Sequence, residues 1–166
     1  MSEAANVGER APPLVLSEFL PYRVVVLGDL ISRRLARAYE AENITIPEWR
    51  VLAVISQADS MAARDVVART PLDKMAVSRA VASLEEKGLV ERQTNPRDKR
   101  VSALLLSAQG RALFARIAQL ALDYERRLLA TLASEERKAL LDILSKLETG
   151  AANVSAGGFP APANSE

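Results

Sequence analysis

The sequence predicts a mainly α-helical fold with one small β-hairpin, and two observations support this. Apolar residues recur every three or four positions through most of residues 14–149, which is the period of a helix with one buried face. Two β-prone segments, 89–94 and 100–106, are separated by the turn-forming residues Asn-Pro-Arg-Asp. The chain has 166 residues, so 14–149 is expected to form one domain. Segments 1–13 and 150–166 are rich in small residues and are expected to be disordered tails.

The first predicted helix covers residues 17–43 and has one long apolar stripe. Pro21 falls in its first turn, where a missing N–H group costs little. The stripe consists of Leu20, Val24, Leu27, Ile31, Leu35 and Ala38. Thr45 and Glu48 then have the spacing of a capping box, which predicts the start of a second helix.

Two further helices are expected before the hairpin. Ser60 can cap a third helix over residues 61–69. Asp73 or Thr70 can cap a fourth. The fourth helix should end at Gly88, because glycine readily adopts the left-handed conformation that follows many helices. The residues of this region expected to face the core are Val81, Leu84 and Leu89.

The chain after the hairpin is expected to form two long helices. Ser107 starts the first, whose apolar stripe is Leu113, Ile117, Leu120, Tyr124 and Leu128. Ser134 caps the second, which carries Leu140, Ile143, Leu144 and Leu147. A single domain cannot cover these stripes together with that of the first helix, so a two-fold symmetric partner is expected. The end segments 14–43 and 107–149 are therefore predicted to be dimerisation helices.

The order of helices and hairpin over residues 44–106 is that of a winged helix-turn-helix. In this fold the helix before the hairpin enters the major groove of duplex DNA, and its first turns meet the bases. The contact candidates on that helix are Lys74, Met75, Val77, Ser78 and Arg79. Arg79 can bind a guanine edge with two hydrogen bonds, and Ser78 can reach a base or a phosphate. The alternatives are a phosphate contact or surface ion pair for Arg79, and inward packing for Met75 and Val77.

The tip of the hairpin holds four charged residues, Arg97, Asp98, Lys99 and Arg100. Cations on a narrow hairpin suit the minor groove or its phosphates, where the potential of DNA is most negative. Asp98 cannot bind phosphate. Residues two positions apart on a strand project to the same side, so Asp98 is expected to orient Arg100 through a charge-assisted hydrogen bond. A role in solubility is the alternative for the whole tip.

Charge distribution and missing residue types narrow the function classes. The formal net charge is +1, but segment 62–101 holds nine Arg or Lys against six acidic residues. The chain has no Cys and no His, which excludes disulfides, thiol nucleophiles and histidine ligands or bases. It also has no P-loop and no GxGxxG motif. We therefore expect no enzyme, no metal and no cofactor. Because no uncharged run is long enough to span a membrane, a cytoplasmic, nucleoid-associated protein is expected.

Three stretches resemble the MarR (multiple antibiotic resistance regulator) family of bacterial transcription factors, over nearly all of residues 17–147. They are PEWRVL at 47–52, VSRAVASLEEKGLVER at 77–92 and DKRVSALLLSAQG at 98–110. The last matches the family's wing signature, an Asp-x-Arg followed by a strand and a Thr/Ser-x-x-Gly helix entry. The resemblance implies a dimer that packs through its first, fifth and sixth helices and binds pseudo-palindromic operators. It places Arg100 in the minor groove, with Lys99 as a second candidate.

The resemblance also implies a small-molecule pocket between the DNA-binding lobes and the dimer helices. The implied function is a repressor that an aromatic acid, a phenol or a CoA thioester releases from DNA. Residues with suitable stacking faces or guanidinium groups are Tyr22, Arg23, Trp49, Arg50 and Tyr124. Ordinary core, interface or surface packing is the alternative for them. The family's redox-sensing branch uses a cysteine that this chain lacks, so thiol-based peroxide sensing is excluded. The alternative function is a winged-helix protein-interaction subunit without specific DNA binding.

Overall fold

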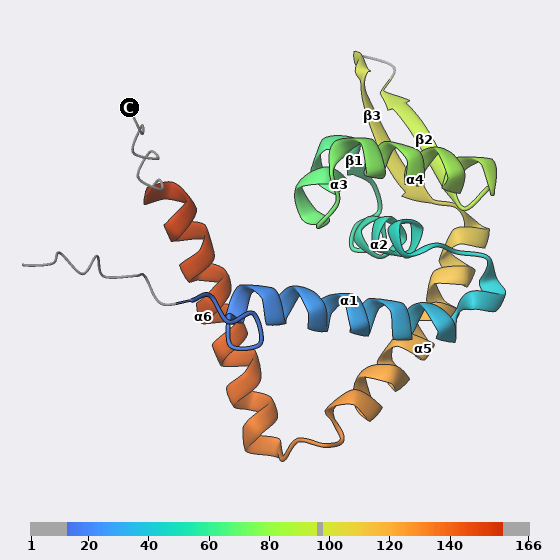
Figure 1. Ribbon diagram of the computed structural model, residues 1–166. Coiled ribbons are helices and arrows are strands. Elements are labelled where there is room, and N and C mark those ends of the chain that lie inside the picture. Colours follow the sequence, from blue (N-terminus) through green and yellow to red (C-terminus); the bar gives the residue numbers. More distant parts are fainter. Residues whose placement is uncertain (1–12, 96–97, 158–166) are drawn as a thin grey trace, which may run out of the picture. The chain divides into compact units, whose positions relative to one another are not determined.

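The computed structural model describes residues 13–95 and 98–157, with side chains except at 94–102 and 155–157. This part of the chain contains six α-helices, one 3-10 helix and three strands (Figure 1). They are α1 (Leu20–Ala38), η1 (Glu40–Glu42), α2 (Ile46–Ile55), β1 (Met61–Ala62), α3 (Ala63–Arg69), α4 (Lys74–Glu86), β2 (Val90–Asn95), β3 (Asp98–Leu106), α5 (Ala108–Leu129) and α6 (Ser134–Gly157). The predicted mainly α-helical fold with a small β element is confirmed.

The chain divides into two compact units, Met1–Ala121 and Leu122–Glu166, and the division falls within α5. The first unit holds α1 to α4, the sheet, the start of α5 and the buried core. Its core includes the predicted Val81, Leu84 and Leu89, which are at most 5% exposed. The second unit holds the rest of α5 and α6, and none of its described residues is buried.

Residues Met61 and Ala62 form a strand, β1, where the sequence predicts the start of a helix. β1 pairs antiparallel with β3, with Met61 opposite Leu104, so the sheet order is β1-β3-β2. This pairing leaves Met61 only 6% exposed. The predicted Ser60 cap is therefore wrong: α3 begins at Ala63, and Ala62 occupies the N-cap position without a side-chain hydrogen bond.

The caps predicted for α2 and α4 are confirmed. The Thr45 hydroxyl accepts from the Glu48 N–H at 3.4 Å, and the Glu48 carboxylate accepts from the Thr45 N–H at 2.7 Å, which completes a capping box. Asp73 caps α4 by accepting from the Ala76 N–H at 2.7 Å. Just after α4, Gly88 has a φ of 68°, the left-handed conformation that was predicted to end the helix.

The first helix is shorter than the predicted 17–43. Tyr39 leaves helical geometry with a φ of −116° and buries its side chain to 1% exposure. The short helix η1 follows, and Asn43 then has a φ of 54°. Asparagine tolerates this left-handed conformation better than most residues do. The break lets the chain turn into α2, which the apolar spacing alone did not indicate.

Of the two serines predicted to cap the last helices, one does so and the other does not. Ser107 precedes α5 and caps it, because its Oγ accepts from the Gly110 N–H at 2.9 Å. Ser134 is the first residue of α6 and not its cap. Ala133 comes before it and donates its N–H to the Glu136 carboxylate at 2.7 Å, so a side chain of the first turn satisfies the free N–H group.

The last helix is also longer than predicted. It continues through residues 150–157, which were expected to belong to a disordered tail. Alanine in this segment favours the helix, and residues 150–157 contain no proline, the next one being Pro160. The rest of the predicted tails, 1–12 and 158–166, lies outside the described residues.

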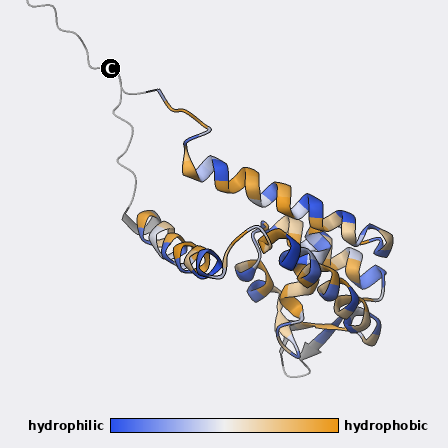
Figure 2. Ribbon diagram, turned by 90° about the horizontal axis from the view of Figure 1, so that it is seen from below, coloured by the Kyte–Doolittle hydropathy of each residue, from blue (hydrophilic) through white to orange (hydrophobic). Residues whose placement is uncertain are grey.

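Both end helices present apolar residues to solvent in the single chain. The predicted stripe residues Leu20, Val24, Leu27, Leu140, Leu144 and Leu147 are 37–53% exposed. Figure 2 shows hydrophobic residues along both helices, and no residue of α1 is buried. Among the described helices, none is long and apolar enough to cross a bilayer. Within its own unit, each helix thus leaves part of its apolar stripe exposed.

Candidate nucleic-acid interface

The outward face of α4 carries four of the five residues predicted as contacts on this helix. The exposed ones are Lys74, Met75, Ser78 and Arg79. Val77 is only 2% exposed, so it is a core residue and not a contact. It stands in one helical row with Val81 and Leu84, both of which are also buried. The first turns of α4 thus combine a packed inner face with an outer face of two cations, a hydroxyl and a thioether.

Two further cations on α3 were missed by the sequence reasoning. Arg64 is in the first turn of α3, with a side chain that is 87% exposed and lies 3.6 Å from the Asp65 carboxylate. Arg69 is in the last turn and is exposed. In a helix-turn-helix, the helix before the recognition helix crosses the DNA backbone, where cations bind phosphates. The excess of basic residues in 62–101 was the one sequence signal for these two.

The hairpin of β2 and β3 extends beyond the helices of the first unit (Figure 1). Its backbone pairs Asn95 with Asp98, after a shift in register. Arg97 lies outside the described residues, as do the side chains of Asp98, Lys99 and Arg100. The contact between Asp98 and Arg100, and the wing's part in DNA binding, stay predictions.

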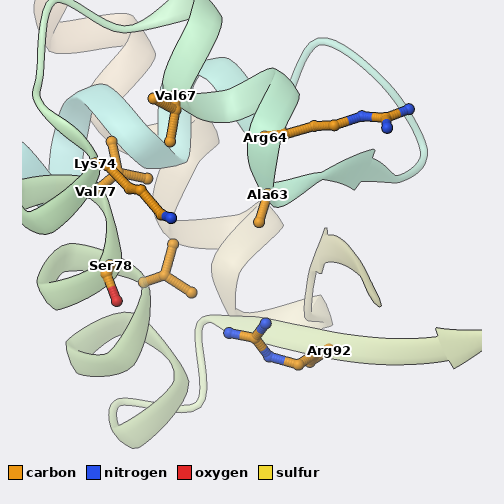
Figure 3. A pocket seen from close by; sticks show the side chains of 8 residues that line it. Ala63, Arg64, Val67, Lys74, Val77, Ser78 and Arg92 are labelled. Carbon is orange, nitrogen blue, oxygen red and sulfur yellow. The ribbon is translucent and has the colours of Figure 1, made fainter. Parts of the chain in front are cut away.

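A cavity of about 410 Å³ opens between α3, α4 and β2. It is lined by Ala63, Arg64, Val67, Lys74, Val77, Ser78, Val81 and Arg92. Figure 3 shows the Lys74 amino group and the Arg92 guanidinium turned toward the same space, whereas the Arg64 guanidinium extends away. Apolar walls with a few polar groups are typical of small-molecule sites. The two cations suit a ligand with an anionic group.

Arg92 is held in this position by Glu85. The Arg92 Nε and Nη2 atoms lie 3.0 and 3.1 Å from the two oxygens of that carboxylate, a bidentate pair. These hydrogen bonds raise the pKa of the Arg92 guanidinium. The pair fastens the start of β2 to α4, so one wall of the cavity is fixed relative to the other.

A buried carboxylate connects α2 to the other end of α4. Glu48 is 3% exposed, and its Oε1 accepts from the Ser83 hydroxyl at 2.6 Å and the Lys87 ammonium at 2.8 Å. The Lys87 ammonium also donates to the Asn43 carbonyl at 2.8 Å. Burial raises the pKa of this carboxyl, but the hydrogen bonds from Lys87, Ser83 and Thr45 together hold it below its usual range. The group is therefore ionised at neutral pH.

The start of α5 packs against the corner that follows α4. The Ser107 hydroxyl donates to the Gly88 carbonyl at 2.7 Å, and the Ser107 N–H donates to the Leu89 carbonyl at 3.0 Å. Gly110 faces the same corner, because a Cβ atom placed there would lie 1.9 Å from the Leu89 carbonyl oxygen. The serine and glycine of the helix entry thus have a physical role: a hydrogen-bonding cap and a close approach of two backbones.

Two of the five predicted effector residues, Trp49 and Arg50, lie in a packed environment. The Trp49 ring stacks on Phe114 with centroids 5.6 Å apart, and its centroid is 5.8 Å from that of Tyr39. Burial raises the pKa of the Tyr39 hydroxyl, and the charge of Arg50 lowers it less. Arg50 donates from Nη2 to the Ser32 hydroxyl at 3.1 Å. Tyr39 and Phe114 were missed, because their sequence positions carry no signal of this stacking.

Two of the other three predicted effector residues, Tyr22 and Arg23, are far from Trp49 and Tyr39 along the first helix. Tyr22 is 46% exposed and lies 17 positions before Tyr39 in the chain, about 25 Å along α1 at the helical rise. Arg23 is its exposed neighbour, and Tyr124 belongs to the second unit. Within the described part of the chain, no cluster of acidic side chains could hold a metal ion.

Comparison with known proteins agrees with the helix-turn-helix geometry. A model of the MarR family matches residues 42–101. The uncharacterized HTH-type transcriptional regulator YdgJ of Bacillus subtilis is 27% identical over 145 residues, 86% of this chain and 88% of that protein. A crystal structure of a MarR/EmrR family regulator from Acinetobacter sp. ADP1 is 28% identical, with a TM-score of 0.77, covering 84% of this chain and 99% of that one. A mutant MarR from Escherichia coli, complexed with operator DNA, is 27% identical with a TM-score of 0.71, covering 81% and 99%.

Proposed function

We propose that this chain, which belongs to the MarR family of transcriptional regulators, acts as a homodimer that binds a pseudo-palindromic operator and leaves it when a small anionic effector binds. The observation that carries the proposal is the outward face of α4, where Lys74, Ser78 and Arg79 stand exposed above a packed core. A helix held this way can enter the major groove without rearranging the fold. Its place of action is the chromosomal DNA in the cytoplasm.

The residues of α4 divide into base-reading and backbone-binding groups. Arg79 is the candidate for a guanine edge and Met75 for a thymine methyl, while Ser78 serves either a base or a phosphate. Lys74 at the helix start, with Arg64 and Arg69 on α3, supplies charge for the phosphates. The hairpin tip contributes Arg97, Lys99 and Arg100 to the minor groove.

The uncovered stripes of the end helices support the dimer. Apolar residues at helical spacing on α1 and α6 are a third to a half exposed in the single chain, and contact with a second copy removes them from water. A two-fold axis also presents two copies of α4 to the same face of DNA, about one helical turn apart. The end segments 14–43 and 107–149 are the proposed dimerisation helices, and 44–106 the DNA-reading part.

Sedimentation and gel retardation test the dimer and its DNA binding together. We expect a dimer even at sub-micromolar concentration, because opening it exposes both stripes. We also expect retardation of the promoter beside the chain's own gene, and not of a shuffled duplex. A well-folded monomer would contradict the dimer, and a dimer that treats both duplexes alike would support the protein-interaction alternative.

At the tip of the β2–β3 hairpin, the wing of the fold, we expect the removal of a cation and the removal of an anion both to weaken operator binding. Arg100→Ala should weaken operator binding about fivefold and reduce its salt dependence, because one cation leaves the groove. Asp98→Ala should also weaken binding, although it removes a charge that repels DNA. Anisotropy titrations over a range of salt concentrations measure both effects, and thermal melting serves as the control. Tighter binding by Asp98→Ala at every salt concentration would show that Asp98 does not orient Arg100.

We place the effector in the cavity beside α4. Its volume of about 410 Å³ is in the range of small-molecule pockets. An aromatic carboxylate would place its ring against Val67 and Val81 and its charge near Lys74 and Arg92. Because Lys74 and Ser78 also face DNA, ligand and operator would compete for the same side chains. The Trp49 and Arg50 site is the second candidate and suits an effector that acts by changing the spacing of the lobes.

Either site would work through a difference in affinity between two states of the dimer. A ligand that favours the DNA-free state by ~1.4 kcal/mol reduces operator affinity about tenfold. A dimer seated on a promoter blocks access to it, so we propose a repressor that the effector releases. Phenolic and aryl-carboxylic compounds and their CoA thioesters are the ligand classes to test first.

A further inference from the structure

Glu48 is a buried charge that no proposed DNA contact uses. It is a residue of α2, yet its Oε1 atom accepts two hydrogen bonds from α4, at 2.6 Å from Ser83 and 2.8 Å from Lys87. Its Oε2 atom accepts from the Thr45 N–H at 2.7 Å. Removing an ionised carboxylate from water is costly, and these bonds offset the cost. Its place in the core therefore depends on the position of α4.

The two α4 residues that bind Glu48 lie in line with the main base-reading candidate. Arg79, Ser83 and Lys87 follow one another at intervals of four, so they form one row along α4 and its C-cap. If the helix rotates about its own axis, all three move together. A bond that fixes Ser83 and Lys87 therefore also fixes the direction in which Arg79 leaves the helix.

We propose that Glu48 is a positioning residue for DNA recognition, which holds α4 at the rotation that aims Arg79 at its base. The inference rests on the proposed function, in which α4 reads the operator. Glu48 touches no DNA in this account and acts through Ser83 and Lys87. Because Glu48 lies in α2, the angle of α4 also depends on the position of α2. The Lys87 ammonium binds the Asn43 carbonyl as well, just after η1.

The carboxylate is suited to this role because all its partners donate. Both oxygens accept hydrogen bonds, from a backbone N–H on one side and from a hydroxyl and an ammonium on the other. Glutamine has the same shape but only one oxygen, so its NH₂ group must face a donor on one side. Glu48→Gln thus loses either the bond from the Thr45 N–H or the bond from the Lys87 ammonium, without a change in volume.

The test compares Glu48→Gln with Glu42→Gln in the full-length protein. Glu42 loses the same charge, and its partner is Arg116, which donates from Nη2 at 2.8 Å and from Nε at 3.1 Å. That pair joins η1 to α5 and involves no residue of α4. Anisotropy titrations measure the affinity of each variant for the operator and for a shuffled duplex, below its melting temperature and corrected for the active fraction. The preference ratio is the affinity for the operator divided by that for the shuffled duplex. A purely structural role would change the active fraction and leave this ratio unchanged.

We expect Glu48→Gln to lower the preference ratio about tenfold, within the range of one misplaced bidentate base contact. Glu42→Gln should retain the wild-type ratio. Should Glu48→Gln fail to fold, Ser83→Ala removes one bond from the same carboxylate and should lower the ratio about threefold. An unchanged ratio in a folded Glu48→Gln, or in Ser83→Ala where that is the variant tested, would overturn the positioning role. A wild-type protein without any preference would instead overturn the proposed function.

Discussion

Gly110→Ala is expected to lower the free energy of unfolding by about 3 kcal/mol, at the upper end of what overpacking costs. The added Cβ atom would lie 1.9 Å from the Leu89 carbonyl oxygen and 2.9 Å from its carbon. These are backbone atoms, and Leu89 is 5% exposed, so the obstacle cannot swing aside. The same carbonyl accepts the Ser107 N–H at 3.0 Å, which the displacement of α5 would break.

Gly150→Ala is the matched control for this substitution. Gly150 also lies in a helix, α6, but a Cβ atom there meets nothing within 4 Å. Alanine should therefore leave stability unchanged or raise it by up to about 1 kcal/mol. Chemical denaturation followed by circular dichroism measures both variants. A Gly110→Ala protein that unfolds at the wild-type denaturant concentration would show that α5 does not pack as closely as described.

Arg79→Ala is expected to weaken operator binding by ~1–3 kcal/mol and to relax the preference for one base pair, because a bidentate contact to guanine is lost. Arg79 is exposed, and no ion pair involves it in the described part of the chain. Folding should therefore be unaffected. Binding of shuffled DNA should fall much less, since the phosphate contacts remain.

Competition titrations with operators changed one base pair at a time measure this effect. Arg126→Ala is a charge-matched control, because Arg126 lies in the second unit and pairs with Asp123. It should leave both affinities as they are. Equal losses by Arg79→Ala on operator and shuffled DNA would show that Arg79 binds a phosphate and reads no base.

The features that could be predicted from the sequence are those that depend on neighbouring residues. The capping box of Thr45, the Asp73 cap and the left-handed Gly88 each depend on contacts within a few positions. The strand β1 could not be predicted this way, because two residues have no periodicity and Met61 pairs with Leu104, far along the chain. Val77 was misassigned although its spacing to buried Val81 did carry the signal.

The candidate site shows the same division between local and distant contacts. The exposed face of α4 follows from helical spacing, so the exposure of Lys74, Ser78 and Arg79 could be predicted. The partners of Glu48 could not be, because Ser83 and Lys87 are 35 and 39 positions away and look like a solvated helix face. The same is true of Trp49, which stacks on the distant Phe114. Residues that connect α4 to distant parts of the chain are visible only once the chain is folded.

A change in the spacing of a symmetric operator tests whether one dimer reads two half-sites with its two α4 helices. Two α4 helices in one dimer should reach half-sites about one helical turn apart on the same face of DNA. An insertion of about five base pairs between the half-sites turns one of them to the opposite face. Anisotropy titration should then show nearly complete loss of preference over shuffled DNA. An insertion of about ten base pairs returns both half-sites to one face and tests how far apart the two α4 helices can bind. Undiminished binding to the five-base-pair variant would contradict the account, because one symmetric dimer could not read both arrangements.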